Sequence, residues 1–216
     1  MNAFETILVP HEQALPKLNE LRRAYKDSGT YPFLIGDARD LDKLLGLIEP
    51  PNDDGAMVIA QAKTIDAQAW FTSKNAKPPR SLPKTAVPPQ SGLSTLYDIL
   101  TGKPKPEIYI GLTQIADPSH LFAKLGFGGW NDCPEPHVHV VIHQYWAEQY
   151  QSVPVAVTGD IVECHIIHPP QVNKDIFRLA GEQYAYCYDI VEQGYGSKAK
   201  LAASLLNAKV WYFWWD

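Results

Sequence analysis

Residues 210–216, VWYFWWD, carry five aromatic side chains in seven positions and end on an acid. Such an aromatic run must be buried in a core or offered to a partner, because frayed chain ends rarely carry so much apolar surface. The run follows a short helical pattern, and Val, Trp, Tyr and Phe favour β-strands. We therefore expect a final strand covered on both faces, with about 2–3 kcal/mol gained for each aromatic side chain it buries.

Short apolar runs alternate with helical patterns in the rest of the chain. This order predicts an α/β protein, with α+β as the alternative, in which helices pack on a mixed β-sheet. The predicted strands are 6–10, 31–37, 56–60, 107–114 and a hairpin that turns at 158–160. The predicted helices are 14–29, 38–50, 64–76, 93–102, 137–150, 173–193 and 197–209.

Residues 77–92, KPPRSLPKTAVPPQSG, hold five prolines and show no apolar periodicity. A proline-rich stretch of this kind is either a linker or an extended loop that crosses one core. As a linker it would join an N-terminal α/β segment, residues 1–76, to a C-terminal α/β domain, residues 93–216. As a crossing loop it would lie inside one continuous domain.

Composition narrows the classes of function. The 216 residues are 45% hydrophobic, which is enough for a sizeable core, and the net charge of −5 argues against a surface that coats nucleic acid. No apolar run approaches the roughly 20 residues that span a bilayer, and the first residues lack the pattern of a secretory leader. Cys133, Cys164 and Cys187 are odd in number and widely spaced. We expect buried, reduced thiols in a cytoplasmic protein.

Four motifs of the second half occur together: GGWNDCPEP at 128–136, HPP at 168–170, LAGEQYAYCYDIVEQG at 179–194 and WYFWWD at 211–216. In this combination the chain resembles, over roughly 107–216, the bacterial family called domain of unknown function 4253. The resemblance implies a bacterial cytoplasmic protein without an established activity, and some relatives look like immunity proteins against secreted toxins. The His-rich HVHVVIH at 137–143 departs from the family pattern, so no role is carried over to it.

The predicted 173–193 helix carries a row of polar residues at spacings of four, three and four, which places them on one face. The glycine-rich loop and the chain end could join this row around one pocket. The candidate pocket residues are Trp130, Asn131, Asp132, Glu182, Tyr186, Asp189, Gln193 and Asp216. They would form a ligand site or a pair of acid/base carboxylates, whereas the plainer interpretation is a solvated helix face. We expect Asp216 to be paired, with Arg178 or the backbone N–H groups of 128–130 as candidates.

His139 and His143 lie one predicted helical turn apart, the spacing that lets two imidazoles bind one metal ion. The pair lacks the Glu of a zincin motif, and Cys164, His165 and His168 do not form a standard zinc-finger spacing. We expect no metal and no cofactor, and histidines that are exposed or hydrogen-bonded. A nucleophilic Cys133 or Cys187 beside a histidine is the weaker alternative.

The sequence contains no complete catalytic motif. The sequence therefore favours a protein-binding module of immunity or regulatory type, whose acidic charge suits a basic partner such as a co-encoded toxin. We expect neither nucleic acid nor membrane as a partner. The alternative is a small hydrolase or ligand-binding enzyme that uses the carboxylate and aromatic pocket.

Overall fold

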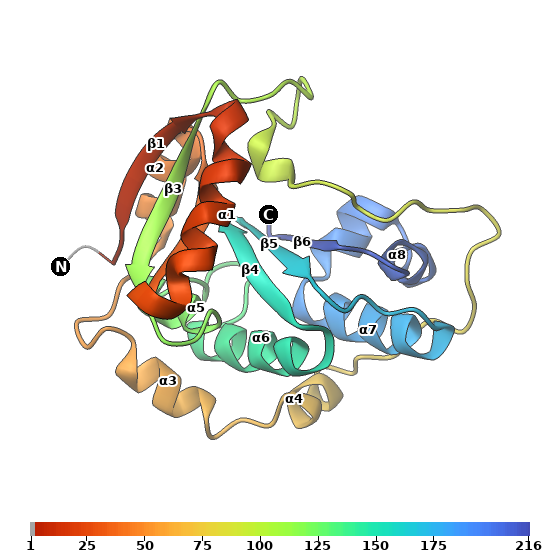
Figure 1. Ribbon diagram of the computed structural model, residues 1–216. Coiled ribbons are helices and arrows are strands. Elements are labelled where there is room, and N and C mark those ends of the chain that lie inside the picture. The colour runs from red at the N-terminus through yellow and green to blue at the C-terminus, as the bar shows by residue number, and fades with distance from the viewer. Residues whose placement is uncertain (1–2) are drawn as a thin grey trace.

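The computed structural model describes residues 3–216 and contains a six-stranded sheet of order β1-β3-β2-β4-β5-β6 (Figure 1). Neighbouring strands are antiparallel except β2 and β4, which pair in parallel, so the sheet is mixed as predicted. The strands are β1 (Glu5–Pro10), β2 (Thr30–Gly36), β3 (Glu107–Gln114), β4 (Ser152–Val157), β5 (Ile161–Ile166) and β6 (Val210–Trp214).

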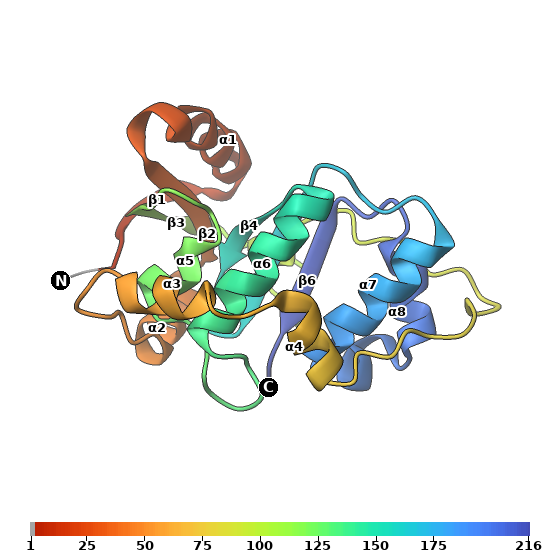
Figure 2. The same ribbon diagram turned by 90° about the horizontal axis from the view of Figure 1, so that it is seen from below.

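Helices cover the two faces of the sheet unequally. Helix α1 lies on one face, and α3, α5 and α6 lie on the other (Figure 2). The helices are α1 (His11–Ser28), α2 (Ala38–Leu47), α3 (Ala56–Ala62), α4 (Ala67–Ser73), α5 (His120–Leu125), α6 (Pro136–Tyr150), α7 (Asn173–Tyr186) and α8 (Lys198–Leu205), with a 3-10 turn η1 (Ser94–Leu96) and a π-helical turn η2 (Ile190–Tyr195). Within residues 3–216, no helix combines the length and the apolar character that a bilayer crossing requires.

Strand β6 is buried as predicted, and one of its faces forms the centre of the larger core. Trp211, Phe213 and Trp215 are each at most 1% exposed. Phe213 stacks on Trp146 of α6 with ring centroids 5.4 Å apart and an interplanar angle of 6°. On the opposite face the side chains at 212 and 214 are only partly buried, and β6 is an edge strand paired with β5 alone. The expectation of cover on both faces therefore holds in part, because Val210 on this second face is buried in the smaller core whereas positions 212 and 214 are partly exposed.

Three element predictions are wrong. Residues 56–60 form helix α3 instead of a strand, because the Asp53 carboxylate accepts hydrogen bonds from the Gly55 and Met57 N–H groups and caps the helix start. Residues 93–102 are helical only over η1. The predicted 173–193 helix ends at Tyr186, where Cys187 adopts φ −148° and ψ 90°, and the chain resumes as η2.

A buried carboxylate fixes the segment that joins α4 to β3. Glu163 of β5 has no exposed surface, yet its two oxygens accept five hydrogen bonds. The donors are the Gln90 side chain, the N–H and hydroxyl of Ser94, and the N–H and hydroxyl of Thr95, at 2.7–3.0 Å. A buried charge is tolerated when it is this fully hydrogen-bonded. Glu163 thus ties the end of the proline-rich segment to the sheet.

The proline-rich segment passes outside α7 and α8 and returns over the sheet to η1 (Figure 1). Strands β1 and β2 precede this segment in the sequence. Strands β3 and β4 follow it, and they pair with β1 and β2. The hydrogen-bonded sheet is therefore continuous between the parts of the chain on either side of residues 77–92.

Phe213→Ala should lower the free energy of unfolding by about 3–5 kcal/mol, because it leaves a cavity between α6 and α7. The matched control is Leu8→Ala on the edge strand β1, where the side chain is already 46% exposed, and we expect a loss below about 1 kcal/mol. Urea unfolding followed by circular dichroism measures both values. Equal losses in the two variants would show that β6 is peripheral to the core.

Glu163→Gln should release the 77–92 segment, because an amide cannot accept hydrogen bonds from all five donors. We expect trypsin to cleave after Arg80 and Lys84 faster in this variant than in the parent protein. Glu107→Gln, at an exposed position of β3, is the control and should leave the cleavage rate unchanged. An unchanged rate in Glu163→Gln would mean that other contacts hold the segment.

Candidate functional site

The eight predicted pocket residues lie in three separate places. The first is a polar corner where Gln193 donates hydrogen bonds to Asp189 at 3.0 Å and to Asp216 at 3.5 Å. The Asp189 carboxylate also accepts the Asp216 N–H at 3.3 Å, and the Asn131 amide donates to the Asp216 main-chain oxygen at 2.5 Å. Asp132 accepts the Tyr188 hydroxyl at 2.8 Å nearby.

Asp216 is hydrogen-bonded but exposed. Its contact with the glycine-rich loop comes from the Asn131 side chain rather than from the backbone N–H groups of 128–130. Arg178 is wrong as its partner, because that guanidinium binds groups on α6 and α7. Trp130 joins the corner only through packing, since its ring lies against Phe127 and Trp215.

Tyr186 occupies the second place, in the middle of a buried row that we call the Cys-His-Tyr chain: Cys133, His139, Tyr186, His143 and Cys164. The Tyr186 hydroxyl lies 2.5 Å from His139 Nδ1 and 2.9 Å from His143 Nε2, so it can donate to one imidazole and accept from the other. The far nitrogens lie 3.3 Å from Cys133 Sγ and 3.7 Å from Cys164 Sγ. Both histidines are therefore buried and hydrogen-bonded.

Burial determines which side chains of the Cys-His-Tyr chain carry a proton. Desolvation lowers the pKa of His143 to about 3 and lowers the pKa of His139 well below its usual value. Desolvation also raises the pKa of both thiols, Cys133 and Cys164. A neutral thiol beside a neutral imidazole is a weak nucleophile, which disfavours Cys133 as the Cys-His nucleophile, and the Cys187 thiol donates to the Trp214 carbonyl at 3.0 Å instead. Within residues 3–216, no three or more His, Cys, Asp or Glu side chains are grouped closely enough to hold a metal ion.

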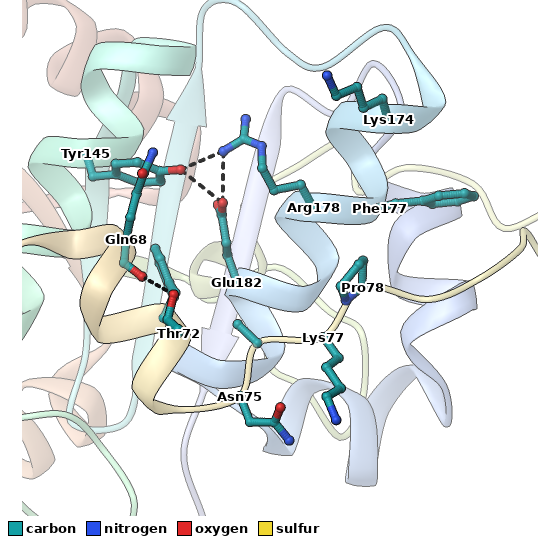
Figure 3. Close-up of a pocket in the computed structure, with 12 residues that line it drawn as sticks. Gln68, Thr72, Asn75, Lys77, Pro78, Tyr145, Lys174, Phe177, Arg178 and Glu182 are labelled. Carbon is teal, nitrogen blue, oxygen red and sulfur yellow. Dashed lines mark hydrogen bonds and ion pairs between the residues drawn. The ribbon is translucent and has the colours of Figure 1, made fainter.

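Glu182 lies in the third place, on the wall of an open cavity of about 710 Å³ between α4, α6 and α7 (Figure 3). Gln68 and Thr72 come from α4, Tyr145 from α6, and Arg178 and Glu182 from α7. The remaining lining residues are Phe71, Asn75, Ala76, Lys77, Pro78, Lys174 and Phe177.

A hydrogen-bond network holds the inner wall of this cavity. The Glu182 carboxylate accepts from the Tyr145 hydroxyl at 3.0 Å, the Trp146 indole at 3.1 Å and the Arg178 guanidinium at 2.8 Å. Arg178 also donates to the Tyr145 and Tyr150 hydroxyls and to Gln149. Burial raises the pKa of Tyr145, so that its hydroxyl stays protonated and can donate. A carboxylate held by three donors joins α6 to α7 and is poorly placed to exchange protons with a substrate.

Ala76 and Lys77, in the outer wall of the cavity, pack closely against α7 and α8. A Cβ at position 181 would lie 2.8 Å from the Ala76 carbonyl oxygen, so Gly181 permits this approach. Lys198 of α8 donates to the Lys77 carbonyl at 2.7 Å. Phe71 packs against Tyr145 and Trp146. The α4 end and the start of the proline-rich segment are thus fixed over the α6–α7 network.

A second surface was missed by the sequence reasoning, which placed a helix there. Residues 97–103 form a turn whose tip exposes Ile99 by 78% and Leu100 by 91%. Asp98 braces it by accepting hydrogen bonds from the N–H and hydroxyl of Thr101, each at 2.9 Å, and from Arg39 at 3.2 Å. These bonds lower the pKa of Asp98 to about 2. The Asp, Thr and Gly of DILTGK are a turn signal that could have identified it.

The family described as Domain of unknown function (DUF4253) matches residues 109–216. The chain belongs to this family. No curated protein and no solved structure matches it. The match includes Tyr145, Arg178 and Glu182, whereas the α4 wall of the cavity and the 97–103 turn lie before it.

The buried imidazoles of His139 and His143 predict a loss of stability in acid. In the unfolded chain each binds a proton below about pH 6.5, whereas the folded protein holds it neutral to much lower pH, so the unfolded state gains protons first. Going from about pH 7.5 to about pH 5.5 should cost about 3 kcal/mol for the pair. Urea unfolding across this range measures the slope.

His143→Gln should reduce the measured pH slope by about a third, even if it also lowers stability at neutral pH, because burial lowers the pKa of His165 to about 4 and this third imidazole contributes to the slope as well. The control His168→Gln replaces an exposed imidazole and should keep the slope of the parent protein. A slope that is the same in both variants would contradict the assignment.

Proposed function

We propose that this protein acts by binding a protein partner, as an immunity or regulatory module, and that the 97–103 turn is its contact surface. The observation that supports this proposal is the pair Ile99 and Leu100. Two large aliphatic side chains stand almost fully in solvent, next to each other, on a turn with defined hydrogen bonds. Exposed apolar groups ringed by polar residues are typical of protein interaction sites.

The bracing of the turn supports recognition. In addition to the bonds of the Asp98 side chain, two backbone hydrogen bonds close the turn. The Asp98 N–H donates to the Lys103 carbonyl at 2.9 Å, and the Gly102 N–H donates to the Asp98 carbonyl at 2.8 Å. A tip that is ordered before binding loses little conformational entropy when a partner covers it. Ile99 and Leu100 themselves line a cavity of about 520 Å³, whose other walls combine the apolar Tyr97 and Ile161 with charged side chains such as Arg39, Lys43 and Lys105.

The charge of the chain bears on the identity of the partner. A net charge of −5 speeds encounter with a basic protein and slows encounter with an acidic one. A basic toxin encoded beside this gene is the partner that best fits this charge.

The double variant Ile99→Ser, Leu100→Ser should weaken binding to the protein encoded beside this gene by at least roughly tenfold, since buried aliphatic contacts at the centre of an interface are lost. Calorimetry with the purified pair measures affinity, and survival of cells that express both measures protection. The control is Met57→Ser, which replaces an apolar side chain that is 70% exposed on α3. Full binding and protection by the double variant would reject the turn as the contact surface.

A further inference from the structure

The α4–α7 cavity has a chemistry of its own, independent of the 97–103 turn. We propose that it binds a small organic anion, a flat aromatic group that carries a carboxylate or a phosphate. The size of the cavity, its aromatic walls and its uncompensated positive charge support this ligand class.

Size and walls favour a small molecule with an aromatic group. A volume of about 710 Å³ falls in the range of ligand cavities, which commonly hold drug-sized compounds. Phe71, Tyr145 and Phe177 each come from a different helix, and Pro78 adds a fourth apolar surface. Aromatic rings surrounding one space favour a planar guest through stacking and edge contacts.

The balance of charge favours an anion. Glu182 is the acid that lines the cavity, and it is neutralised by Arg178 at 2.8 Å. Lys77 and Lys174 line the cavity too, and their ammonium groups form no ion pair within residues 3–216. The cavity therefore has an excess of positive charge although the whole chain is negative.

The geometry also gives the anion a position. Lys174 and Arg178 are four residues apart on α7, so their side chains project from the same face of the helix (Figure 3). All four N–H groups on the terminal nitrogens of Arg178 are engaged with Tyr145, Glu182, Gln149 and Tyr150. Lys174 is thus the free donor at this end of the cavity, and the anionic group should lie beside it with the ring among the aromatic walls.

A matched pair of probes separates charge from shape. Indole-3-propionate and tryptamine share the indole ring and a two-carbon arm, and they end in a carboxylate and an ammonium respectively. Adenosine monophosphate serves as the probe for an aromatic phosphate. Each is titrated into the full chain by calorimetry at low salt and checked by ligand-observed NMR. We expect binding of indole-3-propionate, of adenosine monophosphate or of both, and at least tenfold weaker binding of tryptamine.

Three variants test the placement. Lys174→Glu should weaken anion binding by roughly tenfold or more through charge reversal, and Phe177→Ala should weaken it through loss of the ring contact. Lys26→Glu, on the exposed end of α1, makes the same change in net charge away from the cavity and should have little effect. Thermal unfolding of each variant confirms that it folds.

The outcomes are distinct. Preference for one anionic probe identifies the carboxylate or the phosphate as the ligand group. Equal binding of tryptamine and the anions, equal effects of Lys174→Glu and Lys26→Glu, or no binding of any anionic probe at millimolar concentration would overturn the proposal. The Lys174→Glu and Phe177→Ala variants keep these results independent of the 97–103 turn, because the two cavities share no lining residue.

Discussion

The packing of β6 against α6 and α7 is the interaction on which the arrangement of this protein depends. Trp146 stacks on Phe213, and Tyr186 meets both Phe213 and Trp215 edge to face at 4.9 and 5.3 Å. One aromatic layer thereby fixes the distance and orientation of two helices. Those helices in turn carry the Cys-His-Tyr chain on one side and the Arg178–Glu182 network on the other, so both depend on the same rings.

Two buried carboxylates complement this apolar layer. Glu163 accepts five hydrogen bonds from the segment that follows the prolines, and Glu182 accepts three from α6 and α7. Each acid joins parts of the chain that are far apart in sequence. Because a buried carboxylate is stable only when its donors are in place, each also selects one arrangement of the segments around it.

The parts of the fold that the sequence predicted are those whose signal is local. The apolar runs of β2, β3 and β6 and the length of α6 needed no information from elsewhere. The prediction of a helix over 93–102 failed because the leucines of this segment are spaced as in a helix. The contact that decides its conformation is with Glu163, some 70 residues away. The candidate pocket failed to assemble for a similar reason. Its helical row assumed an unbroken helix, and the break at Cys187 separates Glu182 and Tyr186 from Asp189 and Gln193.

Strand β2 lies outside the segment that matches the family but inside the sheet. The matched segment begins inside β3 and contains β4, β5 and β6, yet in the sheet β3 and β4 are not neighbours, because β2 lies between them. Its residues Thr30–Gly36 provide the hydrogen-bonding partner for β3 and the link to β4. In this chain, therefore, residues 109–216 do not form a continuous hydrogen-bonded sheet without β2. A gene encoding only that segment would have to recruit a replacement strand, from a neighbouring subunit or from a different leader, to close its sheet.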